Sequence, residues 1–140
     1  MMNLDQRLTA FLRLGARLTA FLHTEPEAVA DLARRAAGPN SWFDELNVRA
    51  ALTGIAAMLR DDELRPWLAA YAPASLEPAA PRRVGVVMAG NIPLVGFHDL
   101  LCVLLSGHTL LAKLASTDPV LPRWLVTELL ALEPAFAARI

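Results

Sequence analysis

The fold of this 140-residue chain is decided by residues 84–93, VGVVMAGNIP. Residues 84–89 are continuously apolar, without the polar-apolar alternation of a half-exposed strand, so they predict a strand covered on both faces. Gly90 and Asn91 tolerate positive φ better than most residues, and Pro93 suits the first position of a helix. The stretch therefore predicts a strand, a tight loop and a helix start, as at the beginning of a parallel βαβ unit.

Helices are expected on both sides of this strand. Hydrophobic periodicity and helix-stop signals predict helices before it at residues 4–22, 26–38, 44–60 and 61–71, followed by a Pro-rich connector. After it they predict a crossover helix at 94–106, a second strand at 109–114, a helix at 118–132 and a further helix start at Glu133-Pro134. We therefore expect an α/β fold with a helical N-terminal region at 1–72, a connector at 73–83 and the start of a nucleotide-binding domain at 84–140. An isolated parallel pair leaves strand edges and apolar faces uncovered, so this domain is expected to be incomplete and the chain truncated.

One six-residue string, RLTAFL, occurs at residues 7–12 and again at 17–22. The ten-residue offset is close to three helical turns, about 10.8 residues, so both copies are expected to present the same helix face. The leucine and phenylalanine side chains of the two copies then form an apolar side, with Arg7, Arg13 and Arg17 mostly elsewhere.

Composition limits the possible partners. Hydrophobic residues make up 55% of the chain and charged residues only 19%. This composition indicates apolar surface that packs against a partner, against further residues of the chain or against a second copy in a homo-oligomer. With 13 basic and 14 acidic residues the formal net charge is -1, so no nucleic-acid partner is expected. The apolar segments fall short of the roughly 18–20 residues needed to span a membrane, and no secretory signal is evident. A single cysteine excludes an internal disulfide and a multi-cysteine zinc site, no metal site is expected, and a cytoplasmic location is favoured.

Cys102 and His98 invite a nucleophile hypothesis, because residues four apart share a helix face. The neighbours of Cys102 are apolar, however, and a thiol in apolar surroundings stays protonated, so a packed core thiol is favoured. His98 and the adjacent Asp99 diverge by about 100 degrees on a helix and cannot form a pair. His108, after Gly107, is most simply a turn residue.

Three segments carry a resemblance to a known family: residues 84–99, Ser106-Gly107-His108 and Ala112-Lys113-Leu114, with further signals at 40–43 and 67–68. From Arg83 to Leu125 the chain resembles the long-chain acyl-CoA reductases, which are related to the fatty-acid reductase of luminous bacteria and belong to the aldehyde dehydrogenase superfamily. The resemblance implies an aldehyde-dehydrogenase-like parallel-sheet domain, NADPH or NADH as cofactor and acyl-CoA as substrate. The usual dinucleotide fingerprint, G-x-G-x-x-G, is absent.

The resemblance also implies roles for individual residues. Asn91 occupies the place of the amide that stabilises the substrate oxyanion, whereas the sequence alone also allows a cap or turn role. Lys113 matches the basic residue on the ribose or phosphate side of the cofactor, the alternative being an edge or snorkelling lysine. Gly90 and Ser116 are predicted cofactor contacts. In many relatives Pro and Ser directly follow the lysine, whereas here the hydroxyl of Ser116 is displaced by one position.

The resulting hypothesis is the N-terminal part of an acyl-CoA reductase, which reduces a fatty acyl thioester to an aldehyde. The family's catalytic cysteine is expected beyond residue 140, so the chain is predicted to be inactive alone. The alternative is a non-enzymatic binding or assembly module whose apolar faces bind another chain.

Overall fold

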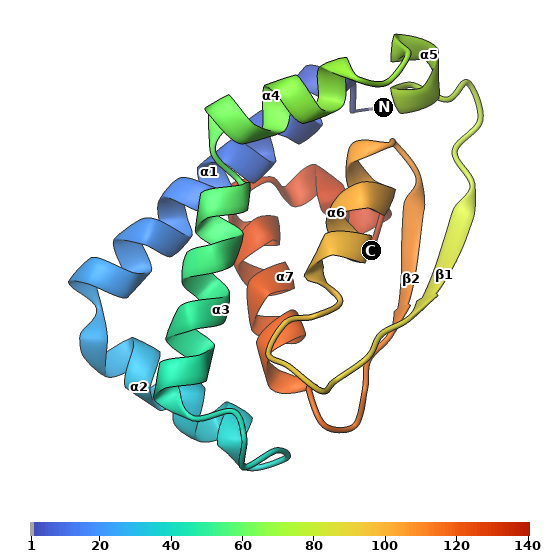
Figure 1. Cartoon of the computed structure of the whole chain (residues 1–140). Coiled ribbons are helices and arrows are strands. Elements are labelled where there is room, and N and C mark those ends of the chain that lie inside the picture. The colour runs from blue at the N-terminus through green and yellow to red at the C-terminus, as the bar shows by residue number, and fades with distance from the viewer. Residues whose placement is uncertain (1) are drawn as a thin grey trace.

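The computed structural model describes residues 2–140, and it is rich in helix around a small sheet of two parallel strands (Figure 1). The α/β prediction is confirmed at this level. In chain order the elements are α1 (Leu4–Thr24), α2 (Pro26–Ala37), α3 (Glu45–Met58), α4 (Asp61–Ala69), α5 (Pro73–Leu76), β1 (Arg83–Val87), α6 (Phe97–Leu105), β2 (Thr109–Lys113), α7 (Val120–Leu132) and the 3₁₀ helix η1 (Pro134–Ala138).

Local signals in the sequence explain where the first helices begin. The side chain of Asn3 accepts a hydrogen bond from the amide of Gln6, whose own side chain accepts from the amide of Asn3, a capping box that starts α1. Pro26 lies at the start of α2, where its missing N–H costs nothing. The carboxylate of Asp44 accepts from the amide of Asn47 at the start of α3. These caps satisfy donors that have no partner within the helix.

The sheet lies at one side of the molecule, with α6 between it and the N-terminal helices (Figure 1). Its register runs from Arg83 opposite Thr109 to Val87 opposite Lys113, and α6 is the crossover between the two strands. The prediction of a strand covered on both faces is wrong for the described residues, because Val87 is 79% exposed and Leu111, on the same face, is 53% exposed. Within residues 2–140 the helices cover only the opposite face, so the apolar run has one buried and one exposed side.

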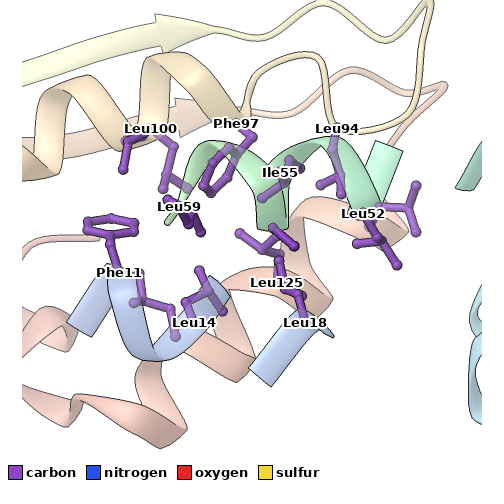
Figure 2. Packing of buried hydrophobic residues seen from close by; sticks show 14 of the residues in the cluster. Phe11, Leu14, Leu18, Leu52, Ile55, Leu59, Leu94, Phe97, Leu100 and Leu125 are labelled. Atoms are coloured by element: carbon purple, nitrogen blue, oxygen red, sulfur yellow. The ribbon is translucent and has the colours of Figure 1, made fainter. Parts of the chain in front are cut away.

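One hydrophobic core joins the helices to the sheet. Figure 2 shows side chains from α1, α3, α6 and α7 pointing toward one another, with Leu94 from the loop before α6. Leu8, Phe11, Leu18 and Phe21 are all buried, so the two copies of RLTAFL do present the same face. The division into regions 1–72, 73–83 and 84–140 stays a prediction, although the expected connector contains the one-turn helix α5.

Arg7 departs from the expectation that the arginines of α1 lie away from the core. It is only 5% exposed. Its guanidinium donates to the backbone carbonyls of Met2 at 2.6 Å, of Leu105 at 3.2 Å and of Leu76. A buried cation is tolerated there because three carbonyl oxygens replace its water.

The crossover helix starts three residues later than predicted, at Phe97 rather than Leu94. Leu94 has a φ of 58°, the only positive φ of a residue other than glycine in the described chain. Positive φ therefore falls on Leu94 and not on Gly90 or Asn91, and Pro93 lies in the preceding turn. Since left-handed backbone is incompatible with an α-helix, α6 cannot begin before the chain has passed Leu94.

Candidate functional site

The loops that follow β1 and β2 lie side by side at the carboxyl end of the sheet (Figure 1). The amide of Met88 donates to the carbonyl of Lys113 at 3.0 Å, and the Thr117 hydroxyl donates to the carbonyl of Gly90 at 3.0 Å. The structure thus brings together the segments that carry Asn91, Lys113 and Ser116. In open α/β sheets, ligands gather at this end of the strands.

Gly90 is where the two loops approach most closely. A Cβ atom at this position would lie 2.3 Å from the Thr117 Oγ1 and 2.6 Å from the Ala115 Cβ, both shorter than real contacts. The carbonyl of Gly90 also accepts from the Asn40 Nδ2 at 3.3 Å, which ties the turn after α2 to the loop. Glycine is therefore required here by close packing between loops, and a contact between Gly90 and a cofactor stays a prediction.

The side chain of Asn91 is exposed at this loop. Within residues 2–140 it makes no hydrogen bond, and the residue at the N-terminal cap of α6 is Gly96, without a side-chain cap. The alternative of a helix-capping asparagine therefore finds no support. An amide without a partner in the protein can donate to the oxygen of a bound molecule.

Asp118 was not singled out by sequence reasoning. Its side chain is buried, and its Oδ2 accepts from the amide of Leu94 at 2.8 Å. Burial raises the pKa of this carboxyl, while the hydrogen bond from the amide of Leu94 acts in the opposite direction. The only sequence signal was Asp118-Pro119 before α7, which indicates a helix start but no contact 24 residues away. The neighbouring Thr117 binds the carbonyl of Gly90, and α7 begins without a side-chain cap.

Lys113 is the only lysine of the chain and lies exposed at the end of β2. In the part of the chain that the structure describes, its ammonium makes no ion pair. It borders an open, mainly apolar groove of ≈ 700 Å³ between β2 and α7, which Arg123 and Thr127 also line. Ser116 is exposed in the loop that follows. A cation beside a groove, with a hydroxyl in the loop that follows, suits the ribose or phosphate of a nucleotide.

The sequence of the chain matches a known protein family over most of its length. Residues 48–140, more than half of the chain, match the family model described as acyl-CoA reductase (LuxC). The chain belongs to this acyl-CoA reductase family. No curated protein and no solved structure matched it. The resemblance inferred from residues 84–99 is thereby confirmed, and the match extends over the candidate site of this acyl-CoA reductase chain.

Cys102 of the acyl-CoA reductase chain lies away from the two loops, on α6. It borders a small pocket of ≈ 250 Å³ with Trp67, Leu68 and Leu76 of α4 and α5. Its Sγ is 3.6 Å from the His98 Nδ1, so the predicted shared helix face is correct. Burial raises the pKa of the Cys102 thiol, and the Asp99 carboxylate raises it further, so the thiolate is disfavoured.

The histidines make local contacts. The His98 ring lies 6.0 Å from the Trp67 ring, between centroids, in a tilted arrangement. His108 Nδ1 accepts from the amide of Arg82 at 3.2 Å, which joins the turn before β2 to the residue before β1. Neither ring belongs to the loops that carry Asn91 and Lys113.

Among residues 2–140, no group of three or more His, Cys, Asp or Glu side chains is placed to hold a metal ion. No helix of this part of the chain combines the length and apolarity that crossing a membrane requires.

Proposed function

We propose that this chain forms the N-terminal part of an acyl-CoA reductase that reduces a fatty acyl thioester to an aldehyde with NADPH or NADH. Membership of the family supports the reaction class. The observation that carries the proposal is the meeting of the two strand ends, where an exposed Asn91 amide and the Lys113 ammonium both lack partners within residues 2–140. The meeting of these strand ends supports the proposal that the sheet belongs to an aldehyde-dehydrogenase-like domain, as the resemblance implies.

Asn91 is proposed to stabilise the oxyanion. When a cysteine thiolate attacks the acyl carbonyl, the carbonyl carbon becomes tetrahedral and its oxygen becomes negative, and collapse of this intermediate expels the CoA thiolate. A neutral amide held on a fixed loop can donate to that oxygen without rearranging. Gly90 and Leu94 are both held by hydrogen bonds, so the three residues between them have little freedom.

Lys113 and Ser116 are proposed to bind the cofactor. The nicotinamide cofactor supplies the hydride that reduces the acyl group. The ammonium of Lys113 would pair with phosphate or bind ribose oxygen, and the Ser116 hydroxyl would bind next to it. Gly90 would contribute by letting the loop after β1 approach the loop after β2, since only glycine fits beside Thr117.

The nucleophile is proposed to lie outside this chain. Cys102 is its only cysteine, and burial and Asp99 disfavour the thiolate. The amide of Leu110, on the edge of β2 away from β1, donates to the carbonyl of Arg139 at 2.8 Å, so the start of this edge is already paired and additional strands would pair with the remainder. Further strands along this edge would complete the parallel-sheet domain and cover its apolar residues.

Kinetics of the acyl-CoA reductase that carries these residues test the proposal. Asn91→Ala is expected to lower kcat about a hundredfold or more with KM little changed, because the amide acts mainly on the developing charge. Asn47→Ala, an exposed asparagine at the start of α3, is the matched control and should leave kcat unchanged. Residues 1–140 alone should oxidise no NADPH in the presence of acyl-CoA. An unchanged kcat in Asn91→Ala, or turnover by residues 1–140, would refute the assignment.

The second candidate is a binding or assembly module. It is favoured by the exposed apolar face of the sheet, where Val87 and Leu111 lie. Such a module would bind its partner without acyl-CoA or cofactor, and Val87→Lys would abolish the complex while Asn91→Ala would not. The acyl-CoA reductase proposal predicts that Asn91→Ala is the damaging change.

A further inference from the structure

Asp118 is the buried carboxylate that holds the loop of the proposed oxyanion amide. The residue is 3% exposed, and it and Arg7 are the buried charged side chains of the described chain. One oxygen, Oδ2, accepts from the amide of Leu94 at 2.8 Å. The other, Oδ1, is buried without a hydrogen-bond partner in residues 2–140. Burying a carboxylate oxygen without a hydrogen-bond partner is unfavourable, and the bond to Leu94 compensates only part of this cost.

Asp118 accepts its hydrogen bond from Leu94, the one residue of the loop with a strained backbone. Leu94 has a φ of 58°, a conformation that disfavours every side chain with a Cβ, and its own side chain is buried in the core. Strain of this kind persists only where the surroundings enforce it. The Asp118 carboxylate does so by fixing the direction of the Leu94 N–H, while burial of the leucine fixes its side chain.

The loop is held at its other end by different atoms. The carbonyl of Gly90 accepts from the Thr117 hydroxyl at 3.0 Å and from the Asn40 Nδ2 at 3.3 Å. Thr117 and Asp118 are neighbours on the segment between β2 and α7, so this one segment holds both ends of the loop. Residues 91–93 form the span between the two anchors, and their exposure increases toward Asn91 and Ile92.

We propose that Asp118 is a positioning residue that fixes the main chain from which the Asn91 side chain projects, by holding Leu94 in its left-handed conformation. The effect on catalysis rests on the oxyanion role proposed for Asn91, whereas the effect on the loop does not. Asp118 touches neither substrate nor cofactor. It acts through the backbone, so the main chain that carries the donor is in place before the substrate arrives.

Nuclear magnetic resonance of the 140-residue chain tests the contact directly. A scalar coupling across the hydrogen bond is expected between the Leu94 amide nitrogen and the Asp118 carboxyl carbon in the unaltered protein. Asp118→Ala should speed hydrogen exchange of the Leu94 amide about tenfold to a hundredfold and shift the Asn91 side-chain NH₂ signals, since a bond to a charged acceptor is lost. Asp118→Asn keeps an acceptor and should restore most of the protection.

Asp99→Ala, an exposed aspartate on α6, is the matched control and should leave the Leu94 amide unchanged. Absence of the coupling in the unaltered protein overturns the proposal even if Asp118→Ala does not fold. A folded Asp118→Ala with unchanged Leu94 exchange and unchanged Asn91 signals also overturns it. If the loop responds as expected but Asn91→Ala leaves kcat of the acyl-CoA reductase intact, the positioning of the loop stands and the proposed role of Asn91 fails.

Discussion

At the scale of single residues, two buried charges are bonded to backbone that lies far away along the chain. Arg7 binds the carbonyls of Leu76 and Leu105, and Asp118 binds the amide of Leu94. Burial lowers the pKa of Arg7 and raises the pKa of Asp118, in both cases by disfavouring the charged form. The charged form of each side chain is therefore stabilised by backbone groups that come close only in the folded chain.

Arg7→Met is expected to destabilise the protein by about 2–4 kcal/mol, because two buried carbonyl groups and one partly buried carbonyl group lose a charged donor at once. Urea denaturation followed by circular dichroism measures the free energy of unfolding. Arg13→Met is the matched control on the same helix: its guanidinium is exposed and donates to the carbonyl of Leu132, so a change within about 0.5 kcal/mol is expected. Equal losses in the two variants would contradict the assigned role of Arg7.

Cys102 is expected to react slowly with a disulfide reagent such as Ellman's reagent. Burial and Asp99 raise the pKa of its thiol, so the thiolate fraction at neutral pH is lower than for an ordinary cysteine, whose pKa is about 8.5. The rate should therefore keep rising with pH beyond the point at which it levels off for an ordinary cysteine. The same chain unfolded in urea should show the ordinary profile, and fast reaction of the folded chain at pH 7 would restore Cys102 as a candidate nucleophile.

At the scale of elements, the candidate site depends on contact between the loop after β1 and the loop after β2. Gly90→Ala places a Cβ against Thr117 and Ala115 and is expected to cost about 1–3 kcal/mol of stability. Gly85→Ala in β1 is the matched control, since a Cβ there meets nothing within 4 Å, and it should cost little. Thermal unfolding of both variants measures the difference. Similar stability losses would show that the two loops are not packed as described.

Much of this arrangement could be predicted from the sequence. The apolar runs at 84–89 and 109–114 and the helix between them were sufficient for a parallel pair, and parallel strands bring Asn91 and Lys113 to the same edge. The left-handed Leu94 could not be predicted, because it depends on a carboxylate 24 residues away. Gly90 and Asn91 correctly indicated a loop. Their usual preference for positive φ predicted the left-handed residue at the wrong position, because it is Leu94.

At the scale of the whole molecule, the helices bury their apolar sides, whereas the sheet leaves one apolar face exposed within residues 2–140. The buried leucines and phenylalanines of α1, α3, α6 and α7 fill a common core, whereas one face of the sheet is exposed within residues 2–140 (Figures 1 and 2). The periodicity of a helix identifies its buried side without further information. A strand that is apolar on both sides indicates only that both faces pack against other elements, and not which part of the chain, or which other chain, supplies those elements.

A lysine introduced on the exposed face of the sheet should destabilise the protein less than a lysine introduced on the covered face. Val87→Lys is expected to change the stability of residues 1–140 by less than about 0.5 kcal/mol, because Val87 is 79% exposed. Leu110→Lys, on the covered face, should unfold the chain, since its side chain is buried. Circular dichroism distinguishes these outcomes, and unfolding by Val87→Lys would mean that its face is covered in solution.

The most direct test of the proposed site uses the only lysine in the chain. Reductive methylation with ¹³C-formaldehyde gives Lys113 a single dimethyl-lysine signal, distinct from that of the N-terminal amine. Titration with NADPH and with NADH should shift this signal, and the shift should be saturable and absent with nicotinamide alone, because the ammonium is assigned to the ribose or phosphate side. A folded chain whose Lys113 signal stays unchanged at millimolar concentrations of both cofactors would contradict a cofactor site at the ends of β1 and β2.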